Sequence, residues 1–308
     1  MTSFKQIAYK AVKIVTKPLQ GSGIGRIKPI NSLYQRYISV LTTRKNELIP
    51  VNNYKMYFHS ENMDCIDESL MFTHQWEPCM TLAFKKLIKP GMVMVDIGAN
   101  VGYFSLLCST LVGKSGRVFS FEPEPGNFAL LMKNIQINSF TNVEAVPKAV
   151  SDKNSTLRLY INTLEQGMHS IIQHESGSST IDIEAVSLDE FFATTNHIVD
   201  IIKIDIEGAE VLALKGMQNT IQRNEKLLFF TEFWPEGLLR AGTTPLDYYN
   251  SLKDIGFKYT YLIDESHKTL RLANYDEVLK SCYTKLYKAP CHVNLLCSKN
   301  ELAISMKL

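Results

Sequence analysis

A short segment containing two glycines holds the residues that point most directly to chemistry. Asp96 is followed by Gly98 and Gly102, with Asn100 between the two glycines. Glycine has no Cβ atom, so this spacing lets the backbone turn sharply out of a strand, approach a ligand closely and enter a helix. A carboxylate at Asp96 would repel a pyrophosphate but attract an ammonium group. The segment therefore predicts a binding site for a ligand with a positively charged end.

A second acid, Glu122, lies 26 positions beyond Asp96, where the next strand is expected to end. An acid at that place can accept hydrogen bonds from both ribose hydroxyls of a nucleoside. A nicotinamide dinucleotide is disfavoured, because dinucleotide folds use a GxGxxG spacing and Gly98 and Gly102 are four residues apart. A nucleoside joined to methionine, as in S-adenosylmethionine, suits both acids. The predicted cofactor-binding residues are Asp96, Gly98, Asn100, Gly102, Phe104, Glu122 and Ser151.

Several further motifs resemble, in the same order, those of the FkbM family of methyltransferases. They are Phe121 to Phe128 (FEPEPGNF), Gly167 to Ser170 (GMHS), Leu188 to Phe191 (LDEF), Ile202 to Glu210 (IKIDIEGAE), Leu214 to Gly216 (LKG) and Val293 to Leu296 (VNLL). The resemblance covers roughly Trp76 to Ser298. It implies a class I methyltransferase fold that uses S-adenosylmethionine. It also implies an acceptor hydroxyl on a sugar, glycan, lipid or natural product.

The predicted catalytic residues are those able to take a proton from such a hydroxyl. Asp205 closes the fourth expected strand, and Glu207 follows it on the next turn. His169 lies in a loop, and histidine suits proton abstraction near neutral pH. In another interpretation, Asp205, Glu207 and Glu232 hold a hard divalent cation that lowers the pKa of the acceptor hydroxyl. Nothing in the spacing demands a metal.

Strands and helices are expected to alternate around these residues. Expected strands cover Val93 to Ile97, Arg117 to Glu122, Val143 to Val146, Val199 to Ile206 and Lys226 to Phe230, with an antiparallel pair at Thr156 to Ile161 and Ile181 to Ser187. Expected helices cover Pro78 to Ile88, Tyr103 to Leu111, Pro125 to Asn138 and Ala209 to Arg223, and one or two strands cover Tyr54 to Ile66. This alternation predicts an α/β fold with a doubly wound, mostly parallel, Rossmann-like sheet. Ligands bind such sheets at the carboxyl ends of the strands.

Composition narrows the class of protein. Hydrophobic residues make up 45% of the chain and charged residues 21%, which predicts a folded globular protein. A net charge of +2 is too small to indicate nucleic acid as a bulk electrostatic partner. The six cysteines include no CxxC pair, which is typical of thiols in a reducing compartment. No apolar run approaches the roughly 20 residues of a membrane-spanning helix, so we expect a cytoplasmic protein.

Residues 1–53 are expected to form a basic, partly helical N-terminal extension and linker, and residues 54–308 the FkbM-like domain. Phe4 to Val15 would place apolar side chains on one face of a helix and lysines elsewhere, until Pro18 ends the pattern. Such a helix can lie on an anionic membrane surface, serve as a targeting peptide, or pack on its own domain or a partner. All three interpretations stay open.

Two alternative functions remain. One is a methyltransferase acting on nucleic acid or protein; against nucleic acid, no N-P-P-[YF] stretch follows the fourth strand, and Cys79 precedes the glycine segment. The other is a non-catalytic module that binds S-adenosylmethionine. An intact set of Asp96, Gly98, Gly102 and Glu122 argues against loss of binding, but binding does not establish turnover.

Overall fold

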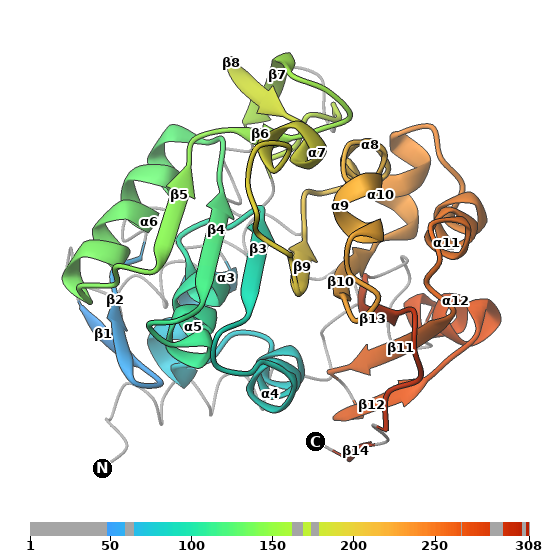
Figure 1. Ribbon diagram of the computed structural model, residues 1–308, viewed down its shortest axis with the longest axis horizontal. Coiled ribbons are helices and arrows are strands. Elements are labelled where there is room, and N and C mark those ends of the chain that lie inside the picture. The colour runs from blue at the N-terminus through green and yellow to red at the C-terminus, as the bar shows by residue number, and fades with distance from the viewer. Residues whose placement is uncertain are drawn as a thin grey trace, which may run out of the picture.

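The computed structural model describes residues 48–58, 65–161, 169–173, 179–265, 267–283, 292–303 and 306–307. The expected amphipathic helix and the linker after it lie outside these residues. The core of the fold is a nine-stranded sheet with the strand order β14-β12-β11-β13-β10-β9-β3-β4-β5 (Figure 1). Across the described ranges, no helix combines the length and apolar character needed to cross a bilayer.

Five strands form the parallel half of this sheet. They are β3 (Val93–Ile97), β4 (Arg117–Phe121), β5 (Val143–Val146), β9 (Ile201–Ile204) and β10 (Leu228–Phe233). Successive residues point to opposite faces of a strand, and here both faces are buried: Met94 belongs to one core cluster and Val95 to the other. Two buried faces explain the unbroken apolar runs in the sequence. The predicted doubly wound α/β fold is confirmed.

Helices cover both faces of the sheet. One core cluster packs α3 (Cys65–Thr73), α4 (Pro78–Leu87), α5 (Tyr103–Val112) and α6 (Pro125–Ile137) against the sheet. The other packs α7 (Leu188–Phe191), α8 (Glu210–Lys215), α9 (Gln218–Gln222), α10 (Pro235–Arg240), α11 (Pro245–Asp254) and α12 (Tyr275–Cys282). Proline begins four of these helices, at a position where its missing N–H costs no hydrogen bond.

Antiparallel strands extend the sheet and add a smaller one. The extension consists of β11 (Tyr259–Asp264), β12 (Thr269–Leu272), β13 (Val293–Ser298) and β14 (Met306–Lys307), with β13 between β10 and β11. The smaller sheet consists of β6 (Ala149–Val150), β7 (Ser155–Ile161) and β8 (Ser179–Val186), and includes the expected antiparallel pair. It lies beyond the end of β4 (Figure 1).

Several local expectations were wrong. The strand expected from Tyr54 ends at Met56 as β2, which pairs with β1 (Ile49–Val51), and Ile66 lies in helix α3. This hairpin spans the boundary expected between residues 53 and 54. The division of the chain into an extension and a domain at that point stays a prediction. The helix expected at 209–223 is two helices, α8 and α9. Between them the Gly216 carbonyl accepts a hydrogen bond from the Asp189 amide instead of continuing a helical ladder.

Candidate functional site

A cavity of about 320 Å³ opens at the carboxyl ends of β3, β4, β9 and β10. This is the edge at which open α/β sheets bind ligands, and the volume is in the range of small-molecule sites. Most of the predicted site residues line it, namely Gly98, Asn100, Phe104, Glu122, His169, Asp205 and Glu207. The remaining three, Asp96, Gly102 and Ser151, do not.

Glycine is favoured at the two positions of the turn for different structural reasons. Gly98 has a φ of 75°, and a Cβ atom there would lie 2.0 Å from the backbone oxygen of Asp205. Any side chain at this position would therefore push the ends of β3 and β9 apart. Gly102 has a φ of 97°, and a Cβ atom there would lie 2.6 Å from Leu131 Cδ1 on α6. That leucine end can move aside, so the positive φ, which residues with a side chain rarely adopt, is the main reason for glycine at this position away from the cavity wall.

Glu122 holds the turn in place as well as lining the cavity. Its Oε2 accepts a hydrogen bond from the Asn100 amide at 2.8 Å, and its Oε1 accepts one from the Glu124 amide at 2.9 Å. Burial raises the pKa of the Glu122 carboxyl to about 7, although both amides act in the opposite direction. Each carboxylate oxygen has a second lone pair, so both can also accept from ribose hydroxyls.

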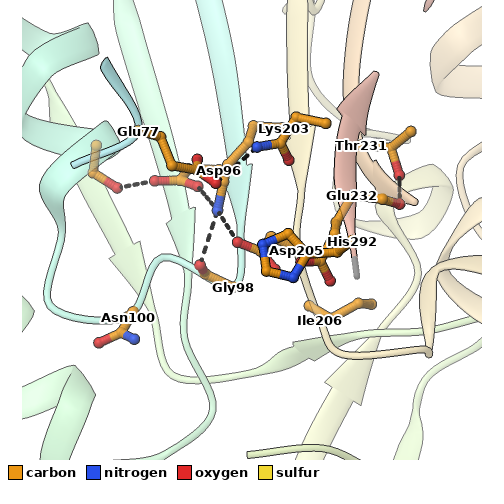
Figure 2. Close-up of polar contacts among 12 residues, drawn as sticks. Glu77, Asp96, Gly98, Asn100, Lys203, Asp205, Ile206, Thr231, Glu232 and His292 are labelled. Atoms are coloured by element: carbon orange, nitrogen blue, oxygen red, sulfur yellow. Dashed lines mark hydrogen bonds and ion pairs between the residues drawn. The ribbon is translucent and has the colours of Figure 1, made fainter. Parts of the chain in front are cut away.

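Asp96 lies beneath the cavity and is fully buried. Its Oδ2 accepts a hydrogen bond from Ser105 Oγ at 2.6 Å, and its Oδ1 lies 3.6 Å from Lys203 Nζ. Lys203 Nζ also contacts the Gly98 carbonyl at 3.4 Å and Asp205 Oδ2 at 3.3 Å (Figure 2). Burial lowers the pKa of Lys203, but Asp205 and Asp96 raise it by more, so the ammonium stays charged. Asp96 thus anchors Lys203, which in turn joins the ends of β3 and β9.

Three carboxylates gather at the other side of the cavity. Asp205 follows β9, Glu207 lies on the next turn with a φ of 54°, and Glu232 lies in β10. One carboxylate oxygen from each lies within 4.8 Å of the others. His292 Nδ1 lies 3.3 Å from Glu232 Oε1 (Figure 2). Burial, followed by the charge of Glu207, raises the pKa of Glu232 well above its ordinary value.

The loop that carries His169 is attached to this cluster. Ser170 is buried and donates a hydrogen bond from Oγ to the Glu207 backbone oxygen at 2.8 Å. It also pairs with Tyr160 through two backbone hydrogen bonds. The attachment brings His169 to the cavity wall, near the predicted acids. Ser151, by contrast, is buried outside the wall, where its amide donates to the Val186 carbonyl.

Comparison with known proteins decides the family. The model of the methyltransferase FkbM domain matches residues 96–259, just over half of the chain. The chain belongs to the FkbM methyltransferase family. The sequence resemblance is thereby confirmed, and the fold is that of the class I, S-adenosylmethionine-dependent methyltransferases.

Individual relatives of this FkbM chain are distant. The hexuronic acid methyltransferase AglP of Haloferax volcanii is 29% identical over 132 residues, which cover 42% of this chain and 52% of AglP. Methyltransferase 1 of Beauveria bassiana is 23% identical over 146 residues, covering 41% and 58%. The chain thus spans little more than half the length of these curated relatives. A crystal structure of a methyltransferase FkbM from Methylobacillus flagellatus is 16% identical, with a TM-score of 0.43, and covers 71% of this chain and 50% of that one.

Residues outside the FkbM match also line the cavity, and sequence reasoning missed them. Glu77 precedes α4 with a φ of 39°, and its Oε1 accepts a hydrogen bond from Asn294 Nδ2 of β13 at 2.7 Å. Burial, and then the charge of Asp205, raises the pKa of the Glu77 carboxyl to about 8. His292 reaches the cavity from the residue before β13. The signal available in the sequence was the pair Glu77 and Pro78 at a helix start, which does not indicate a distant partner.

Proposed function

We propose that the cavity binds S-adenosylmethionine and that the protein transfers its methyl group to a hydroxyl of a sugar, glycan, lipid or natural product. In this reaction the bond between the methyl carbon and the sulfonium sulfur breaks as a bond to the acceptor oxygen forms. The hydroxyl proton passes to a base, and S-adenosylhomocysteine leaves with a neutral sulfur. The protein has to align the two reactants and accept the proton.

One observation carries the proposal: Glu122 and Asp205 line the same cavity from neighbouring parts of one sheet edge. Glu122 suits the ribose, as its carboxylate faces the cavity beside the glycine turn. The donor also carries a positive sulfonium and a positive ammonium group. Acids around the cavity favour such cations, because a carboxylate in a partly desolvated site attracts a cation more strongly than it does in bulk water. The acids are Glu77, Asp205, Glu207 and Glu232, and Asp96 lies beneath them.

The acceptor end is proposed to lie beside Asp205. Asp205, Glu207 and His169 all line that part of the cavity and are the proposed proton acceptors. Trp234 lines it as well and offers an apolar wall for a ring. Similarity to AglP, named a hexuronic acid methyltransferase, favours a sugar hydroxyl among the possible acceptors.

Calorimetric titration of S-adenosylmethionine and S-adenosylhomocysteine tests the donor site. We expect binding to the wild type and about tenfold or weaker affinity in Glu122→Ala, which corresponds to about 1.4 kcal/mol. Glu144→Gln is the matched control, since Glu144 is an exposed acid on the adjacent strand β5. A folded wild type that binds neither ligand contradicts the proposal. Incubation with uronic acid glycans, followed by mass spectrometry for a methyl ester or ether, then separates an enzyme from a non-catalytic binding module.

A further inference from the structure

We infer that Asp205, Glu207 and Glu232 form a binding site for one divalent cation that prefers oxygen ligands, such as Mg²⁺ or Mn²⁺. The site occupies the acceptor side of the cavity. Its use in methyl transfer rests on the proposed function, whereas the binding of the ion does not.

The geometry of the three carboxylates suits a single ion. One oxygen from each lies within 4.8 Å of the other two. Oxygen ligands lie about 2.0–2.6 Å from Mg²⁺ or Ca²⁺, so ligand atoms on opposite sides of one ion are about 4–5 Å apart. Three carboxylate ligands with no sulfur among them favour a hard cation over zinc or copper. The remaining positions of an octahedral ion are open to water and to an acceptor hydroxyl.

The backbone holds the three acids on rigid elements. Strands β9 and β10 are paired in parallel, with Ile204 opposite Thr231. Asp205 and Glu232 are the next residue after each of these, so the two acids lie side by side at the end of this pairing. Glu207 has a left-handed φ of 54°, a conformation that side-chain-bearing residues rarely adopt. Ser170 fixes the carbonyl of Glu207 through its hydrogen bond. The fold thus maintains an unfavourable conformation that directs Glu207 to the cavity wall.

Glu232 supplies a second, independent indication of a ligand. Its side chain is 8% exposed, and Oε1 lies beside His292. Oε2 is buried and forms no hydrogen bond with any described residue. The Glu232 side chain lines the cavity wall. A buried polar atom without a partner loses the hydrogen bonds that it would make to water, which destabilises the folded state. A cation between Glu232 and its neighbours supplies the missing partner.

The charges nearby leave room for a cation. Among the described residues, the ammonium group that contacts the cluster is that of Lys203, and it is shared between Asp96 and Asp205. Lys148 also lines the cavity but pairs with Glu184. Asp205 contacts Lys203 through Oδ2, so its second oxygen remains for the ion. Next to Glu232, the charged group that the described residues place closest is His292, whose Nδ1 lies 3.3 Å from Oε1 and leaves Oε2 facing the cluster. A bound cation would lower the pKa of a coordinated acceptor hydroxyl and orient its oxygen toward the methyl group.

Binding of Mn²⁺ to the full-length chain tests this site without any turnover. Electron paramagnetic resonance measures free Mn²⁺ as the ion is titrated into the wild type, Glu232→Gln, Glu207→Gln and the control Glu236→Gln. Glu236 is a partly exposed acid of α10 that pairs with Arg240 and does not line the cavity. We expect one Mn²⁺ per wild-type or Glu236→Gln chain, displaced by excess Mg²⁺. Affinity should fall about tenfold or more in each cluster variant.

Titration of S-adenosylmethionine into the same samples separates the two proposals. Retained donor binding with no Mn²⁺ binding, or with equal Mn²⁺ affinity in the wild type and both cluster variants, overturns the cation site and leaves the proposed function standing. Specific Mn²⁺ binding by a chain that does not bind S-adenosylmethionine supports the cation site and overturns the proposed function. If Glu232→Gln fails to fold, Glu207→Gln decides, because Glu207 is a loop residue with a partly exposed side chain.

Discussion

Lys203 and Asp96 lie directly opposite each other in the register of β9 and β3, and their side chains form an ion pair at 3.6 Å beneath the cavity floor. Both side chains are almost completely inaccessible to solvent. The same ammonium reaches the Gly98 carbonyl and Asp205, so one side chain connects the glycine turn, the strand beneath it and the predicted catalytic acid. One side chain therefore links the two sides of the cavity, through the Gly98 turn on one side and Asp205 on the other.

Replacing Lys203 by Met should destabilise the protein by about 3–5 kcal/mol, because the change leaves the Asp96 carboxylate buried without its cation. Chemical unfolding followed by circular dichroism measures the loss. The double variant Lys203→Met with Asp96→Asn should recover part of it, since no uncompensated charge then remains. Equal stability of the single and double variants would mean that the ion pair is not what the fold depends on.

The stability of the ligand-free protein should fall as the pH rises from about 4.5 to 8. Glu77 has a pKa of about 8 in the native state and 4.5 as its ordinary value, so in this window the native state binds more protons than the unfolded state. The free energy of unfolding then decreases with pH. Glu122 and Glu210, each with a pKa of about 7, contribute over the lower part of the window.

The variant Glu77→Gln isolates this effect. Glutamine keeps the hydrogen bond from Asn294 but does not titrate, so its unfolding free energy should depend less steeply on pH between 5 and 8. Urea unfolding at several pH values measures both slopes, with Glu144→Gln as the control. Parallel curves for Glu77→Gln and the wild type would contradict a protonated Glu77 in the native state.

A substitution at Gly98 should be far more harmful than one at Gly113, although both residues have positive φ. Gly113 has a φ of 64° with nothing within 4 Å of an added Cβ atom, so Gly113→Ala should cost only backbone strain, about 1–3 kcal/mol. Gly98→Ala adds a collision with the Asp205 carbonyl, which belongs to the backbone and cannot rotate away. We expect a loss of about 4 kcal/mol or more. Similar melting temperatures for the two variants would show that the β3 and β9 ends can separate freely.

Sequence reasoning found the sheet and most of the cavity because both follow local rules. Apolar runs mark buried strands, and acids at their carboxyl ends meet at one edge, as Glu122 and Asp205 do. It failed where a residue's role depends on contacts distant in the chain. Glu77 acquires its partner Asn294 from a position 217 residues away. The strand pattern also did not reveal that Asp96 lies opposite Lys203 in the sheet register. Contact between Asp96 and the cofactor stays a prediction.

Methyl transfer should depend more on Asp205 than on His169. Asp205 sits at the end of a paired strand, within the carboxylate cluster, whereas His169 reaches the wall from a loop held by Ser170. With a glycan that is methylated by the wild type, Asp205→Asn should lower turnover about 100-fold or more, in the range of general base catalysis. His169→Ala should lower it less. Formation of S-adenosylhomocysteine measures turnover, and calorimetry confirms that each variant still binds the donor. A larger loss in His169→Ala, with donor affinity intact, would make His169 the base and leave Asp205 with a positioning role beside Lys203.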